Sequence, residues 1–333
     1  GYSAGVIMKK KTIILILLIL VSCLTRDRGL REIPTNQEHV IRLMRIIDPR
    51  LPSLSETDFL RMVKTLKGYI HEYLGYRVTF FVKADRDLLA FQKDTRYLKD
   101  TEKMQKLQQS LLNPSIEKDR LRLKKYISAL IRKTDPGTLK AYVPEYEKHK
   151  QRMADHLFQE YTNKLEHILN IKTSNGTVLN HPAFRDMLTY PFWEIALQHL
   201  TEADFIFTNT IMADMEVDIP IYVILRYGIT TGMVTENHFN SYQAAGVIFT
   251  MPFLSKDIFF QRERIEEIPE SLLPDVIALY ATHEFGHFLN RFRDYYNHKN
   301  CIMVPANDLN YQRWYRERKA AKCPLKHEKL KQF

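Results

Sequence analysis

One stretch of the sequence decides how the rest is interpreted: Ala281-Thr282-His283-Glu284-Phe285-Gly286-His287-Phe288-Leu289-Asn290. His283 and His287 are four residues apart, and on an α-helix this spacing places both imidazoles on one face. Two neutral imidazoles so placed can bind one divalent metal ion, most often Zn²⁺. Glu284 points beside the metal, where it can take a proton from water and give it to a leaving amine. The stretch therefore predicts the centre of a zinc hydrolase, and the alternative is a helix that carries these residues by chance.

The residues around this stretch predict that it belongs to a helix. Ser271 offers an N-cap, and Pro274 falls in the expected first turn, where proline is tolerated. An apolar stripe at helical spacing follows, at Val276, Ile277, Leu279 and Tyr280. Asn290 can adopt the left-handed conformation that ends a helix. The chain would then turn back and could bring a third ligand to the metal.

A methionine follows the histidine pair, in the segment Cys301-Ile302-Met303-Val304-Pro305. With this segment, the H-E-x-x-H stretch resembles the metzincin clan of zinc metallopeptidases, and the Cys-x-Met tail is reminiscent of the archaemetzincin branch. The resemblance covers roughly residues 203–325. It implies peptide-bond hydrolysis, with the histidine pair as zinc ligands, Glu284 as general base and Met303 in a turn beneath the zinc. It also implies an α+β fold, in which a mixed twisted sheet accompanies the active-site helix.

The third ligand departs from the metzincin pattern. The clan places it six residues after the second histidine, where this chain has Arg293, which stays protonated and cannot bind zinc. Asp294 is one residue further on, and a turn longer by one residue would present its carboxylate, so we predict Asp294 as the third ligand. His298 is the alternative, and Glu317 is the ligand that a gluzincin-like site would use. The clan's glycine is Asn290 here.

The three cysteines limit what else the resemblance can imply. A second zinc site with four cysteines, as in archaemetzincins, cannot be complete, because only Cys301 and Cys323 follow Cys23. Outside the cytoplasm those two residues are expected to form a disulfide rather than to bind a metal.

Residues 1–23 are expected to be a targeting segment. Lys9, Lys10 and Lys11 form a basic region, and the apolar run that follows is too short to span a bilayer. The run ends in Leu20-Val21-Ser22-Cys23, which looks like a bacterial lipoprotein signal whose cysteine is lipidated. An ordinary secretory signal or a signal anchor is the alternative. Each version places the body outside the cytoplasm, and lipidation of Cys23 would anchor it to the cell envelope membrane.

The charge balance excludes one class of partner. The net charge is +10, and removal of the three signal lysines leaves 10 − 3 = +7. The basic residues are mixed with acidic ones, and no basic tract is interleaved with aromatic residues as in nucleic-acid-binding chains. We therefore expect a peptide or protein substrate and an anionic membrane nearby, and no nucleic-acid partner. The sequence does not define the oligomeric state.

The remaining patterns predict the domain organisation. Residues 24–53 are predicted to form a polar tether and a first helix at 37–47. Residues 54–333 are predicted to form the peptidase-like domain. The expected elements of that domain are a helix opened by Ser55 and stopped by Gly75, a strand at 77–83, a helix at 191–200, and strands at 204–208, 219–227 and 246–251. The last strand is either an edge strand that binds substrate or an ordinary core strand. Residues 86–172 have helical composition, broken at Pro136, and predict a large helical insertion.

These observations predict a zinc-dependent metallopeptidase anchored to the cell envelope as a lipoprotein. Two other readings remain: an inactive metallopeptidase fold that binds a partner, favoured by Arg293 at the expected ligand position, and a surface adhesin whose helical insertion binds envelope or host components.

Overall fold

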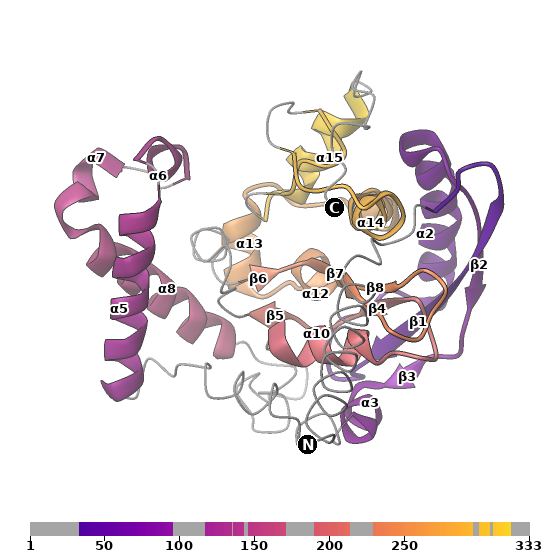
Figure 1. Cartoon of the computed structure of the whole chain (residues 1–333), viewed down its shortest axis with the longest axis horizontal. Helices are drawn as coiled ribbons and strands as arrows, with labels where there is room; N and C mark the ends of the chain where they lie inside the picture. The colour runs from indigo at the N-terminus through magenta and orange to yellow at the C-terminus, as the bar shows by residue number, and fades with distance from the viewer. Residues whose placement is uncertain are drawn as a thin grey trace, which may run out of the picture. The chain divides into compact units, whose positions relative to one another are not determined.

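The computed structural model describes residues 33–95, 117–134, 136–142, 146–170, 190–213, 229–295, 300–306 and 309–320. These residues form a mixed six-stranded sheet with helices on both of its faces, so the predicted α+β class is confirmed (Figure 1). The predicted signal segment, Cys23 and the strand at 219–227 lie outside the described residues.

The main sheet has the strand order β2-β1-β4-β8-β7, with the short β3 also paired to β1. The strands paired in parallel are β1 (Glu38–Ile47), β2 (Arg77–Val82), β3 (Arg86–Asp87), β4 (Phe205–Thr208) and β8 (Ala244–Phe249). β7 (Gly232–Glu236) runs antiparallel to β8 and forms the edge. Of the two readings of residues 246–251, the edge strand is therefore wrong, because β8 lies between β4 and β7. A separate two-stranded sheet pairs β5 (Met212–Ala213) with β6 (Ile229–Thr230).

The segment predicted as a first helix at 37–47 is β1, an interior strand of the sheet, so that prediction was wrong. At its start, His39 and Ile41 are buried, whereas Val40 between them is exposed. This period of two is that of a strand with one face covered, and further along Leu43 and Met44 are both buried because helices cover both faces. Because β1 pairs with both β2 and β4, the domain that we predicted to start at residue 54 already includes Glu38.

The helix and strand that follow β1 were predicted correctly. α2 (Glu56–Tyr69) begins after Ser55, whose side chain accepts a hydrogen bond from the Asp58 backbone N–H. A short π-helical turn, η1 (Ile70–Leu74), continues it and ends at Gly75, which has a left-handed φ of 79°. The chain then enters β2.

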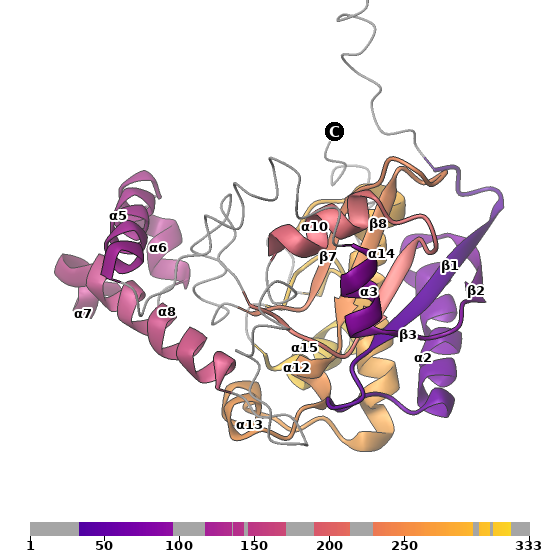
Figure 2. The same cartoon turned by 90° about the horizontal axis from the view of Figure 1, so that it is seen from below.

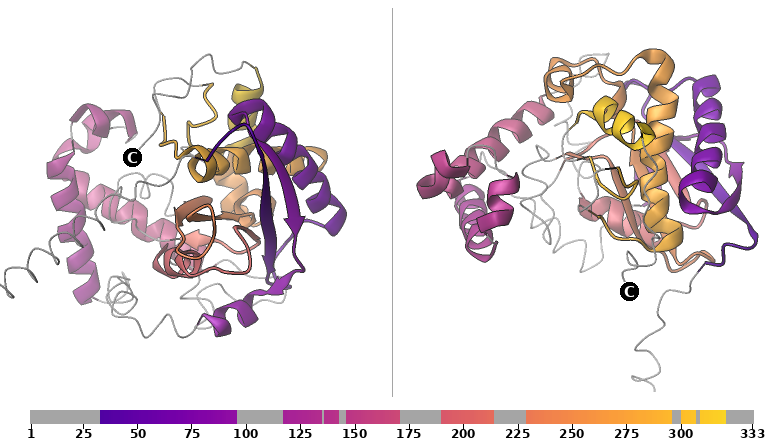
Figure 3. Two further views of the ribbon diagram at one scale, coloured as in Figure 1. Left: turned by 45° about the vertical axis from the view of Figure 1, so that its right-hand side comes forward. Right: turned by 90° about the horizontal axis from the view of Figure 1, so that it is seen from above.

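One face of the sheet is covered by α2 and by α14 (Leu273–Asn290), which lie side by side (Figures 2 and 3). Phe59 of α2 packs on Phe207, and Phe285 of α14 stacks on Phe205 with ring centroids 4.4 Å apart. The other face carries α10 (Tyr190–Gln198) and α3 (Leu88–Asp94), which bury a core around Trp193. The helix that bears the histidine pair thus packs on the sheet through Phe285 and lies against α2.

The start of α14 differs from the prediction. Ser271 lies in a 3₁₀ turn, η5 (Glu270–Leu272), and no side chain caps the helix at Leu272. Pro274 occupies the first turn, as expected.

The predicted helical insertion is helical where the structure describes it, with one boundary corrected. Its helices are α5 (Glu117–Lys133), α6 (Pro136–Tyr142), α7 (Tyr146–His149) and α8 (Met153–Leu169), and α5 packs on α8. Leu88 and Phe91, at the predicted start of the insertion, belong instead to the core beneath the sheet. The insertion therefore begins after residue 94. No helix among the described residues combines the length and the apolar character needed to cross a membrane.

Candidate metal centre

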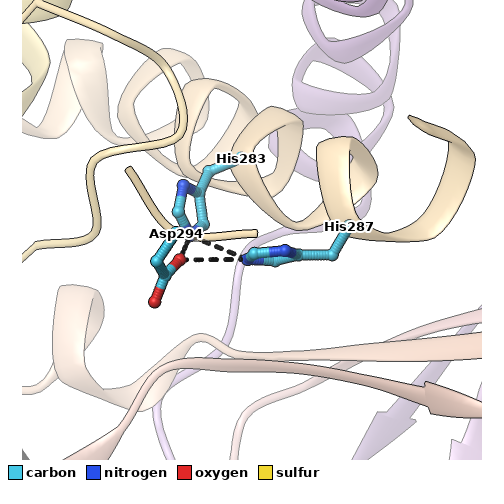
Figure 4. A group of neighbouring side chains, drawn as sticks. All are labelled: His283, His287 and Asp294. Carbon is cyan, nitrogen blue, oxygen red and sulfur yellow. Dashed lines mark hydrogen bonds and ion pairs between the residues drawn. The ribbon is translucent and has the colours of Figure 1, made fainter. Parts of the chain in front are cut away.

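Three side chains place one donor atom each at a common point (Figure 4). The Nε2 atoms of His283 and His287 are 3.3 Å apart. Oδ1 of Asp294 lies 3.4 Å from the first nitrogen and 3.2 Å from the second. The spacing of the two histidines on α14 therefore does what the sequence predicts, and Asp294, the predicted third residue, joins them.

A left-handed residue at the end of α14 brings Asp294 back to the helix. That residue is Arg291, with φ 56° and ψ 30°, and not Asn290 as predicted. A left-handed arginine is unfavourable by itself. Its buried guanidinium offsets that cost by donating hydrogen bonds to the backbone carbonyls of Phe288, at 2.5 Å, and Tyr242. The helix thus continues through Asn290, and the turn after Arg291 brings Asp294 to the two histidines.

Backbone carbonyls fix the orientation of both imidazoles. Nδ1 of His283 lies 2.8 Å from the carbonyl oxygen of Ile302, and Nδ1 of His287 lies 2.5 Å from that of Phe292. A carbonyl only accepts, so each Nδ1 carries the proton and donates it. In the neutral form of each ring, Nε2 then has a lone pair directed at the common point. This is the arrangement in which protein imidazoles bind metal ions.

The electrostatics of the three groups require positive charge between them. Burial opposes a charge on His287, but the adjacent carboxylate of Asp294 outweighs it and raises the pKa of His287 to about 9. Burial alone would raise the pKa of Asp294, but the two histidines hold it well below its usual range. Oδ1 of Asp294 is buried and makes no hydrogen bond of good geometry. Its carboxylate therefore depends on a proton or a metal ion held by the histidines.

The centre is open to solvent on one side only. The side chain of His283 is 2% exposed, whereas those of His287 and Asp294 are 24% and 30% exposed. Solvent therefore reaches the centre at His287 and Asp294, whereas His283 is buried.

Glu284 lies beside the three donors and not among them. Its Oε1 is 3.9 Å from Nε2 of His283, and the residue is 4% exposed. Its side chain is directed against the edge strand β7, where it meets the backbone of Gly232. The carboxylate can therefore accept a proton from a water molecule at the centre.

The segment after the turn packs against the helix that carries the histidine pair. Met303 is fully buried, and its Sδ lies close to the backbone of Gly286, the residue before His287. Its carbonyl accepts a hydrogen bond from the backbone N–H of Tyr295, at 2.8 Å, which ties the segment to the turn that carries Asp294. Met303 therefore packs against α14 at Gly286, next to His287, and its role in a Met-turn stays a prediction.

The last described helix, α15 (Tyr311–Ala320), holds this segment in place. The carbonyl of Val304 accepts hydrogen bonds from Nε1 of Trp314, at 2.8 Å, and from the buried guanidinium of Arg318, at 3.3 Å. Glu317, the gluzincin-like alternative ligand, hydrogen-bonds Arg313 and Arg318 and is not one of the grouped donors. No pattern in the sequence indicated the roles of Trp314 and Arg318.

Two of the predicted residues, His298 and Cys323, lie outside the described residues. The alternative ligand and the disulfide therefore stay predictions. Cys301 is fully buried beside Met303.

Comparisons of the chain with models of protein families, with curated proteins and with solved structures found no match.

Proposed function

We propose that the protein is a zinc-dependent metallopeptidase that uses His283, His287 and Asp294 as ligands and Glu284 as general base. One observation carries the proposal. The three donor atoms are separated by 3.2, 3.3 and 3.4 Å. A tetrahedral zinc site with ligand bonds of about 2.0–2.1 Å separates its ligand atoms by about 3.3 Å.

The chemistry of the donors also fits zinc. Zn²⁺ binds imidazole nitrogen and carboxylate oxygen, and a catalytic site keeps its fourth position for water or substrate. Here three donors converge from α14 and the following turn, and the side of His287 and Asp294 is open. Bound zinc would supply a water molecule with a pKa near neutrality and a Lewis acid for a carbonyl oxygen.

Side chains and backbone groups of the protein would transfer the protons, orient the ligands and bind the substrate. Glu284 is close enough to the donors to take the proton from the attacking water, and its carboxylic acid can then protonate the leaving amine. The carbonyls of Ile302 and Phe292 keep the imidazoles in the tautomer that leaves Nε2 available. The edge of β7 can bind an extended peptide by backbone hydrogen bonds.

The metzincin-like identity belongs to the same proposal. It is supported by the helix with the histidine pair, by the buried Met303 packed against it and by the mixed sheet beside it. Lipidation at Cys23 and attachment to the cell envelope rest on the sequence pattern alone. Arg293 at the expected ligand position no longer favours an inactive fold, because Asp294 reaches the two histidines instead.

The substitution Glu284→Gln tests the assignment of the general base. We expect the variant to keep its zinc and to lose peptide hydrolysis by roughly 10²–10⁴-fold, because the amide is isosteric but cannot accept the proton. The measurement pairs metal content with turnover of a mixed library of fluorogenic peptides. Glu270→Gln, at an exposed residue of η5, is the matched control and should leave turnover unchanged. Undiminished turnover in Glu284→Gln would remove Glu284 from the mechanism. Zinc without turnover in the unaltered protein would favour the binding-protein alternative.

A further inference from the structure

Gly232, the first residue of the edge strand β7, lies directly against the side chain of Glu284. A Cβ atom built on Gly232 would be 2.4 Å from Oε1 of Glu284, 2.5 Å from Cδ and 2.6 Å from Cγ. All three distances are too short for non-bonded heavy atoms, which meet at about 3.5–4.0 Å. Any residue with a side chain at this position would therefore displace Glu284 or move the strand.

The strand has little freedom to move. Gly232 is paired with Ile248 of β8, and the backbone N–H of Phe249 donates to the carbonyl of Thr231 at 2.8 Å. The hydroxyl of Thr231 is buried and lies 2.6 Å from the hydroxyl of Tyr311 on α15. Backbone pairing and this hydroxyl contact together hold the start of β7 against α14.

The base of Glu284 is fixed as well. Its neighbour Phe285 is fully buried and stacks on Phe205 of β4, so α14 cannot turn about its axis. A collision that reaches Cγ cannot be relieved by the carboxylate alone, and the whole side chain has to adopt another rotamer. The carboxylate would then leave its place beside Nε2 of His283.

We propose that Gly232 is a positioning residue: its lack of a side chain lets the edge strand press against Glu284 and hold that carboxylate beside the metal centre. The catalytic consequence rests on the proposed function, whereas the contact itself does not. A close backbone approach is one of the few reasons for a glycine inside a strand.

The experiment compares three glycine-to-alanine variants. Gly232→Ala meets Glu284, Gly246→Ala on β8 meets the ring of Phe205 at a similar distance, and Gly68→Ala on α2 meets nothing within 4 Å. Each is made in the unaltered protein and in a Glu284→Ala background, where the atoms that collide with residue 232 are absent. The measured quantities are the midpoint of thermal unfolding, the zinc content, and kcat and KM for a fluorogenic peptide.

The contact predicts a specific pattern in the unfolding midpoints. Gly232→Ala should lower the midpoint in the unaltered protein and should lower it far less when Glu284 is alanine. Gly246→Ala should lower it equally in both backgrounds, and Gly68→Ala should lower it in neither. An equal loss for Gly232→Ala in both backgrounds would overturn the proposal.

The catalytic part predicts a fall in kcat of roughly a hundredfold or more for Gly232→Ala, with KM and zinc content unchanged, because only the general base is displaced. An unchanged kcat, or a loss of zinc, would overturn the positioning role. If no variant and no unaltered protein hydrolyses peptide, the proposed function fails. The unfolding midpoints still decide whether Gly232 holds Glu284.

Discussion

Three lone-pair donors that face one another at 3.2–3.4 Å repel unless a positive charge lies between them. In the metal-free protein that charge is a proton, because Asp294 raises the pKa of His287 to about 9. A metal ion has to displace this proton, since only the deprotonated Nε2 is a ligand. The same residues thus make the site selective for cations and sensitive to pH.

The affinity for zinc is expected to rise with pH over the range in which His287 is protonated. Below a pKa of about 9, each bound ion releases one proton from His287, so the apparent association constant should rise about tenfold per pH unit between about pH 6 and pH 8. Competition with a chromophoric chelator of known affinity at several pH values gives this slope. A constant affinity over the range, after correction for the chelator, would show that His287 carries no displaceable proton.

At the scale of single residues, the sequence predicted the grouped donor residues better than it predicted the residues packed around them. His283, His287 and Glu284 could be assigned from spacing within one helix, and Asp294 from a turn of one extra residue. Gly232 could not, because it is 284 − 232 = 52 residues from Glu284 and only the packing of β7 on α14 brings them together. Local spacing carries information about one helix but not about which strand lies beside it.

Two elements end where the sequence predicts, and two others differ from the prediction. Ser55 and Gly75 mark the ends of α2 and η1 as predicted, because a side-chain cap and a left-handed glycine act within one turn. The left-handed residue after α14 is Arg291, whose side chain finds two carbonyls that only the folded chain supplies. β1 was mistaken for a helix because its short apolar run suits both periods, and its partners β2 and β4 are distant in sequence.

Two glycines near the end of α2 provide a matched test of backbone conformation. Neither Gly75 nor Gly68 has any atom within 4 Å of a built Cβ, so the substitutions differ only in backbone strain. Gly75→Ala should lower the free energy of unfolding by about 1–2 kcal/mol, since its φ of 79° is left-handed. Gly68→Ala, at a helical position, should raise it by about 0.5–1 kcal/mol. Urea unfolding measures both, and equal effects of the two substitutions would contradict the assigned conformations.

In the whole molecule, the residues of the candidate site and those of the helical insertion come from different parts of the sequence. Among the described residues, those that orient the three donors come from α14, the turn after it, residues 301–304, α15 and Tyr242, just before β8. The order of the sheet strands, with β7 at the edge, was beyond sequence analysis because it depends on pairing between segments far apart in the chain. The composition of residues 86–172 did indicate helices, since helical propensity is local, but not that Leu88 and Phe91 belong to the core.

Removal of the insertion should therefore leave the metal centre intact. A variant in which residues 117–170 are replaced by a flexible glycine and serine linker is expected to bind zinc with unchanged stoichiometry. Among the described residues, no donor and no hydrogen-bond partner of a donor lies in α5, α6, α7 or α8. Metal analysis of the folded variant measures this. Loss of zinc, with the circular dichroism of the remaining domain preserved, would mean that the insertion contributes to the site.

The zinc content of the purified protein tests the central claim most directly. After dialysis against metal-free buffer, elemental analysis should find one zinc ion per chain in the unaltered protein and in His238→Ala, which removes an exposed histidine outside the site. His283→Ala should bind little or none. An unaltered protein without zinc, or a His283→Ala variant that keeps as much as the control, would contradict the account.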